Sequence, residues 1–176
     1  MRTKLILGAV AALVVVLATY WFLIRQDTAD PRILVPQPVA TIGAGSEAIG
    51  VSANGRLVRW LPLPEDPPLP QLPLEGTPKG GRVQGPALEQ VRVLAAVPDA
   101  LAPYIASSAF GESGVEITLT TGIEIEFGDS SRAGRKWRAA AAVLADPEVT
   151  ALDYVNVISP SRPSYDGSEY ELPPPP

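Results

Sequence analysis

Acidic and basic side chains are the residues of this 176-residue chain that could do chemistry, because it contains neither cysteine nor histidine. That absence excludes thiol chemistry, disulfides, Ser-His and Cys-His nucleophile systems and the commonest zinc ligands. Carboxylates, hydroxyls, lysine and arginine remain. Candidate sites are therefore places where spacing brings several carboxylates or several cations together.

Three glutamates lie together on a predicted hairpin. A three-residue loop at 120–122 places Leu119 opposite Ile123 and keeps the alternating apolar residues of both strands on one face. The same register places Glu116 opposite Glu126, with Glu124 nearby. Such a cluster could be an acid/base pair or a cation site. We favour a solvated outer face, because no Asn, His or nearby loop ligand supports a site.

Four cations lie on a predicted helix from Arg132 to Leu144. Helical spacing groups one apolar face, made by Ala133, Trp137, Ala140, Ala141 and Leu144. The opposite face carries Arg132, Arg135, Lys136 and Arg138. These cations could bind anionic lipid or a cell-wall polymer, or form a solvated face. Residues 129–131 are cap candidates, and Asp146-Pro147 ends the helix.

The whole-chain composition favours a protein that is not an enzyme. No constellation of catalytic groups converges, so we expect no catalytic residue, cofactor, metal or small-molecule substrate. The net charge of −5 and pI near 4.8 argue against nucleic-acid binding, which needs a basic surface.

The N-terminal 26 residues are predicted to anchor the chain in a membrane. Leu5 to Ile24 carries no charge and would form about 30 Å of helix, the thickness of a bilayer core. Arg2 and Lys4 precede it, and acidic residues follow it. The positive-inside rule therefore places the N-terminus in the cytoplasm and the rest outside. A cleaved signal peptide is the alternative, but the aromatic end of the segment favours an anchor.

The remainder divides into a linker at 27–37, a β domain at 38–163 and a Pro-rich tail at 164–176 that is predicted to be disordered. The fold class is therefore α+β: one N-terminal transmembrane helix, then a small, mostly antiparallel β domain with two or three short helices. Predicted elements are a strand at 38–42, an irregular Pro-rich segment at 62–86, and helices at 87–97 and 98–105.

A second hairpin is predicted around Asn54-Gly55, a strong two-residue turn signal. Pairing across that turn places Val51 opposite Val58 and Ile49 opposite Trp60. All four side chains then share one face, so Trp60 is expected in the core.

The final predicted strand, 151–158, offers a docking edge if it pairs with only one neighbour. Its free N–H and C=O groups would then accept a strand from a partner. The residues expected to contact that partner are Arg135, Arg138, Asp153, Tyr154 and Asn156. A covering tail is the alternative.

The order of several short motifs resembles the C-terminal β domain of the FtsQ/DivIB family of bacterial cell-division proteins. The motifs are Pro38-Val39-Ala40, "LPQLPLEG" at 69–76, Gly128 with Lys136, and Leu152-Asp153 followed by Pro160. The resemblance covers residues 38–163. Residues 25–37 are too few to hold the POTRA domain that precedes the β domain in that family.

The resemblance implies a division scaffold in the cell membrane, at the septum, with its β domain outside the cytoplasm. Its partners would be bitopic coiled-coil division proteins of the FtsB and FtsL kind, docked on the last strand and helix. The bilayer would be its second partner, through the anchor helix. A membrane-tethered binder of lipid or cell-wall anions is the alternative function.

Overall fold

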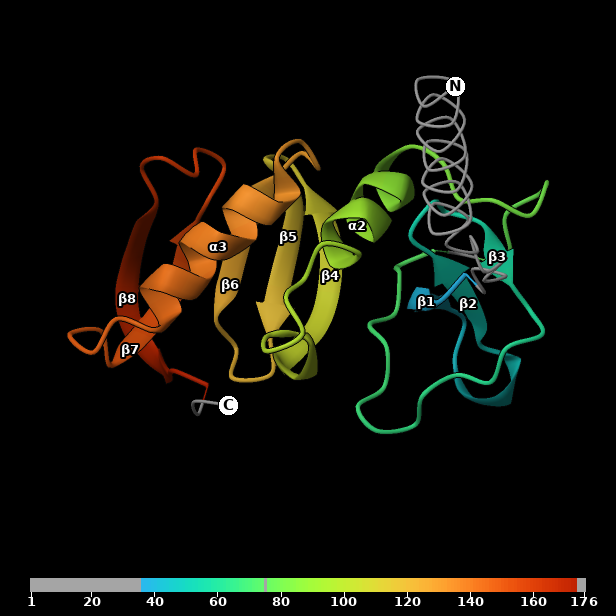
Figure 1. The fold of residues 1–176 in the computed structure, drawn as a ribbon, viewed down its shortest axis with the longest axis horizontal. Helices are drawn as coiled ribbons and strands as arrows, with labels where there is room; N and C mark the ends of the chain where they lie inside the picture. Colours follow the sequence, from blue (N-terminus) through green and yellow to red (C-terminus); the bar gives the residue numbers. More distant parts are fainter. Residues whose placement is uncertain (1–35, 75, 174–176) are drawn as a thin grey trace, which may run out of the picture. The chain divides into compact units, whose positions relative to one another are not determined.

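The computed structural model describes residues 36–74 and 76–173 (Figure 1). The chain divides into two compact units, Met1–Val35 and Pro36–Pro176, and the described residues belong to the second. The predicted anchor at 5–24 lies outside the described residues. Among those described, no helix is long and apolar enough to cross a membrane.

Two sheets make up this unit. The three-stranded, antiparallel sheet has the order β1 (Pro38–Ile42), β2 (Ile49–Ser52), β3 (Leu57–Val58). The five-stranded sheet has the order β4 (Ile105–Gly111), β5 (Gly114–Leu119), β6 (Glu124–Gly128), β7 (Ala151–Asn156), β8 (Ser164–Glu171). Neighbouring strands in this sheet are antiparallel, except that β6 and β7 are parallel.

The predicted fold class is wrong as stated. The described residues form two sheets and two α-helices, α2 (Pro86–Leu94) and α3 (Ala133–Leu144), with short 3-10 turns at Gly45–Glu47 and Ala102–Tyr104. The second predicted helix, at 98–105, is reduced to the 3-10 turn. Residues 164–171 are a strand, so the predicted disordered tail is also wrong over that range.

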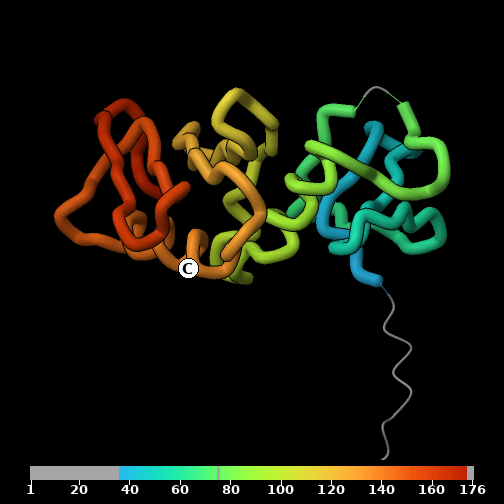
Figure 2. The backbone as a smooth tube through the Cα atoms, turned by 90° about the horizontal axis from the view of Figure 1, so that it is seen from above, coloured from blue at the N-terminus to red at the C-terminus, as the bar shows by residue number. Residues whose placement is uncertain are grey.

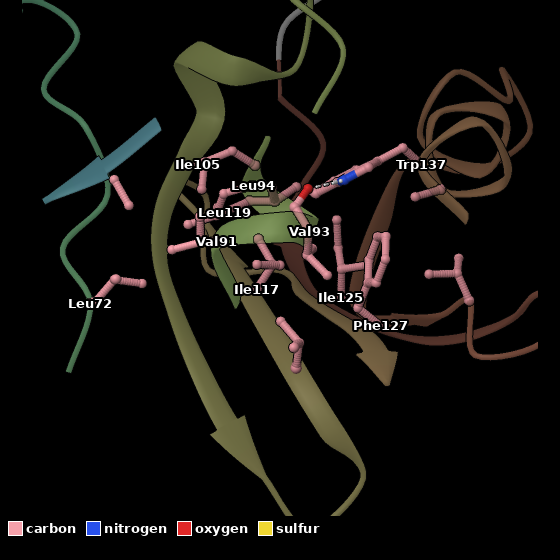
Figure 3. Packing of buried hydrophobic residues seen from close by; sticks show 14 of the residues in the cluster. Leu72, Val91, Val93, Leu94, Ile105, Ile117, Leu119, Ile125, Phe127 and Trp137 are labelled. Carbon is pink, nitrogen blue, oxygen red and sulfur yellow. Dashed lines mark hydrogen bonds between the residues drawn. The ribbon is translucent and has the colours of Figure 1, made fainter. Parts of the chain in front are cut away.

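Both helices cover the same face of the five-stranded sheet (Figure 1). α3 connects the parallel strands β6 and β7, which need a crossover of this kind. Trp137 of α3 is fully buried, and its indole N–H donates to the Val93 carbonyl of α2 over 2.9 Å (Figure 3). Its ring lies 5.1 Å from that of Phe127 on β6. The helix orientation predicted from spacing is thus confirmed at Trp137.

The β5–β6 hairpin has the predicted register. The N–H of Leu119 donates to the Ile123 carbonyl, and that of Gly122 to the Leu119 carbonyl, each over 2.9 Å. Gly122 takes the left-handed φ of +103° that the third loop position requires. Glu116 lies opposite Glu126, as predicted.

The β2–β3 register was predicted wrongly. Val51 pairs with Leu57, and Trp60 is 71% exposed. The loop is a second three-residue turn, because Gly55 donates its N–H to the Ser52 carbonyl and Ser52 donates to that of Arg56. Gly55 is the third loop residue, with φ of +80°, as Gly122 is in the other hairpin. The Asn-Gly pair therefore does not form a two-residue turn here.

The Pro-rich segment closes both edges of the small sheet. On the β1 side, Thr41 donates its N–H to the Pro70 carbonyl and accepts one from Leu72. On the β3 side, Leu57 donates to the Gly81 carbonyl over 2.9 Å. Figure 2 shows this green segment wound closely around the blue and teal strands. Leu72 is fully buried, so this segment packs against the core as well as along the edges of the small sheet.

Candidate functional site

The edge strand of the five-stranded sheet is β8, not the strand at 151–158 that was predicted as the edge. The predicted docking strand, β7, pairs with β6 on one side and β8 on the other, so its backbone is occupied on both sides. β8 is the outermost strand in the sheet order (Figure 1). Seven of its eight residues are exposed, and Tyr170 is half-buried. Within residues 36–74 and 76–173, the strand edge without a neighbour on this side of the sheet therefore belongs to β8.

Asp153 fixes the shape of β8. Its Oδ1 accepts the N–H of Ser168 over 3.0 Å and that of Glu169 over 2.7 Å, at an irregularity in the β7–β8 register. Gly167, at the same place, has a φ of +98°. A Cβ on Gly167 would come within 2.1 Å of the Asp153 carboxyl carbon. Asp153, predicted to contact a partner, thus holds a bulge within the chain.

Negative charge runs along β8. Asp166, Glu169 and Glu171 are three of its eight residues. The charge of Glu169 raises the pKa of the neighbouring Tyr170 phenol, with a smaller contribution from Asp153. Residues 86–173 carry thirteen acidic and six basic side chains in all, so few cations are available to offset the edge.

An apolar pocket opens at the C-terminal end of β8. It has a volume of about 700 Å³ and is formed by residues 98–104, the end of α3 with the turn after it, and residues 171–173. Its apolar walls include Leu101, Leu144 and Leu172. Asp146 and Glu171 are the charged residues of its lining. Sequence reasoning missed this pocket, because three distant segments build it.

Arg135 and Arg138 are exposed on α3, as predicted. They border a shallow hollow with Arg132, Ala133 and Gly134. In the part of the chain that the structure describes, none of the three arginines forms an ion pair with a carboxylate. The geometry therefore leaves this basic surface open to solvent.

Lys136 was predicted on the same exposed face, and this is wrong. It is 1% exposed, and its Nζ donates to the carbonyls of Phe127 and Asp129 over 2.9 Å each, and to Asp129 Oδ1 over 2.7 Å. The hydrogen bond from Lys136, with another from Ser131, lowers the pKa of Asp129 to about 2. Asp129 is therefore not the helix cap, and Arg132 occupies that position without a side-chain cap bond.

The other two predicted site residues, Tyr154 and Asn156, lie on a strand that is paired on both sides. Tyr154 lies on β7 between Glu124 of β6 and Asp166 of β8. Asn156 donates its side-chain N–H to Glu126 Oε2 and accepts the N–H of Ile158 over 3.1 Å. Among the described residues, the acidic side chains, those of the β5–β6 hairpin included, do not converge in a group of three or more that could hold a metal ion.

Comparison with the models of known protein families and with curated proteins gives no match for this chain. The candidate site is therefore defined by its geometry: a bare, acidic edge strand beside an apolar pocket.

Proposed function

We propose that this protein is a non-enzymatic scaffold of the bacterial cell-division machinery. It is anchored in the cell membrane with its N-terminus in the cytoplasm, and it binds bitopic division proteins at the septum through its extracytoplasmic β domain. The bare edge of β8 is the observation that carries this proposal. The resemblance of residues 38–163 to the FtsQ/DivIB β domain supplies the cellular setting.

An unpaired strand edge on a packed sheet is suited to strand addition. A partner in extended conformation gains backbone hydrogen bonds along the edge, and its alternate side chains determine selectivity. β8 supplies such an edge over eight residues, Ser164–Glu171. It is held by pairing to β7 and by the two hydrogen bonds to Asp153, so the template is ordered before a partner arrives. Preorganisation of this kind reduces the entropic cost of binding.

The test is co-purification of the tagged full-length chain from its own membranes, with proline variants of the edge. Successive N–H groups of a regular strand point to opposite sides, so one of Tyr165→Pro and Asp166→Pro removes a donor on the outer side. That variant should stay folded and lose the bitopic division partners, whereas Tyr165→Ala and Asp166→Ala should keep them. If both proline variants are folded and both retain the partners, β8 is not the binding edge.

The exposed arginines of α3 support a second candidate, a membrane-tethered binder of lipid or cell-wall anions. Three cations without ion pairs among the described residues form a concave basic surface, which suits phosphate or carboxylate. The fraction of protein that pellets with anionic vesicles or peptidoglycan should then fall as salt is raised. It should also fall in the double variant Arg135→Glu/Arg138→Glu. Pelleting that is insensitive to both would exclude this function.

A further inference from the structure

The pocket beside β8 has the size and lining of a binding site. Its volume of about 700 Å³ lies within the range of about 300–1,000 Å³ typical of ligand pockets. Small side chains keep it open, because Ala100, Ala141 and Ala145 stand where larger residues would fill the space. Leu144, 9% exposed, joins the pocket to the hydrophobic core. An incoming apolar side chain would therefore contact the core of the sheet.

The pocket is continuous with the free strand. Glu171 is the last residue of β8, where it pairs with Ala151, and it also lines the pocket. Leu172 and Pro173 continue the lining directly after the strand. A strand added to β8 would run along the edge in one direction or the other, and either way one of its ends would lie at the pocket mouth.

The charges around the strand and the pocket select the partner. Asp166, Glu169 and Glu171 lie on β8, and Asp146 lines the pocket together with Glu171. Arg138 lies in the middle of α3, seven residues or about 10 Å before Ala145, and is not part of the pocket lining. Like charges opposite one another destabilise a strand pair, so the acidic edge disfavours a second copy of this chain. A basic segment would be attracted to the same edge.

We propose that the pocket binds an apolar side chain at one end of a basic, extended partner segment, whose remaining residues pair with β8. This inference rests on the proposed function and adds the chemistry of the partner. The segment carries lysine or arginine opposite the acidic residues of β8. A large aliphatic or aromatic residue at its end fills the space between Leu101, Leu144 and Leu172. The apolar anchor supplies affinity, and the charges supply selectivity and speed of association.

The experiment is a selection from a phage-displayed library of random peptides of about twelve residues, enough to cover the edge and reach the pocket. The target is the full-length chain in detergent, and the enriched peptides are then synthesised with a fluorescent label for titration. Enriched sequences should combine lysine or arginine with a large apolar residue at one end. Their binding should weaken as salt is raised, because the edge charges are exposed.

Two matched variants test the pocket. Ala145→Trp fills it, and Ala142→Trp places the same side chain on the same exposed helix face one turn earlier, outside the lining. Binding of the labelled peptides should fall by about tenfold or more in Ala145→Trp, as when a buried anchor is lost, and change little in Ala142→Trp. Glu169→Lys with Glu171→Lys should weaken binding of the same basic peptides.

The outcomes separate this inference from the proposed function. If the peptides lose binding to the proline variants of β8 but bind Ala145→Trp normally, the pocket proposal is overturned and strand addition stands. Loss of binding in Ala145→Trp without any effect of the prolines would overturn strand addition instead. Enrichment of acidic peptides, or no enrichment, would overturn the inference. The inference would also be overturned if a variant truncated after Pro173 bound the peptides about tenfold more tightly than the full chain. The last residues of the full chain would then be the occupant of the pocket.

Discussion

The two sheets of this protein differ in how their edges are treated. Both edges of the three-stranded sheet are covered by the Pro-rich segment, which bonds to Thr41 on β1 and to Leu57 on β3. In the five-stranded sheet, β8 ends the strand order, with seven of its eight residues exposed and three acidic. A chain that covers two edges with its own backbone leaves a third one open and charged. Covered edges are protected against pairing, whereas no other strand pairs with the outer side of β8 among the described residues, which is the side that our proposal assigns to a partner.

The other end of the five-stranded sheet sharpens this contrast. β4 is also terminal in the strand order, but its sequence, IASSAFG, carries no charge. α2 packs against it, and Gln90 of that helix accepts a hydrogen bond from Ser108 over 3.1 Å. β4 is therefore the natural control for β8, since both are edge strands of one sheet and only β8 is acidic.

The largest expected effect is on the core that supports both edges. Trp137→Ala should lower the free energy of unfolding by about 3–5 kcal/mol, because it empties a buried site and removes the indole hydrogen bond to the Val93 carbonyl. Trp60→Ala, at a 71% exposed position, should change it by less than about 0.5 kcal/mol. Urea denaturation measures both. Similar values for the two tryptophans would contradict the packing of α3.

The covered edges should depend on the Pro-rich segment. Leu72 is fully buried and holds this segment against β1, so Leu72→Ala should cost about 2–5 kcal/mol. Hydrogen exchange should rise at the Thr41 amide, which bonds to Pro70, and stay unchanged on β8. Exchange that rises equally on both sheets would mean that the segment is not a local cover.

The bare edge should depend on Gly167. Gly167→Ala places a Cβ against Asp153 at a left-handed φ, so it should cost about 1–3 kcal/mol and raise hydrogen exchange along β8. Gly134→Ala is the control, because nothing lies within 4 Å of its added Cβ, and it should stabilise α3 by up to about 1 kcal/mol. If Gly167→Ala leaves exchange on β8 unchanged, the bulge does not hold the strand.

The smallest effect concerns pH. Because the pKa of Asp129 is lowered to about 2, its bond to Lys136 stabilises the fold above the ordinary aspartate pKa of about 3.9, and this contribution is lost as pH falls towards 2. The carboxylate side chain is 67% exposed, so the effect should stay below about 1 kcal/mol. Asp129→Asn should remove this part of the acid dependence in denaturation from pH 5 to 2. An unchanged dependence would contradict the assignment.

Periodicity predicted the buried faces well, since alternation on β5 and β6 and helical spacing around Trp137 depend on local geometry. It failed at Lys136, because spacing fixes where a side chain leaves the helix, and a long ammonium can still reach the Phe127 and Asp129 carbonyls. It failed at Trp60, because Asn54-Gly55 also fits a three-residue loop. β8 was missed because an edge strand with seven of its eight residues exposed carries no alternating apolar pattern, and Tyr165 and Tyr170 were its only aromatic signal.

The most direct test of β8 as the binding edge compares the two terminal strands of the five-stranded sheet inside the cell. Tyr165 on β8 and Phe110 on β4 are 45% and 44% exposed, so a photo-crosslinking phenylalanine analogue at either site samples solvent equally. We expect crosslinks to a bitopic division protein from position 165 and none from position 110. Equal crosslinking from both positions, or crosslinks from 110 alone, would contradict the claim that β8 is the binding edge.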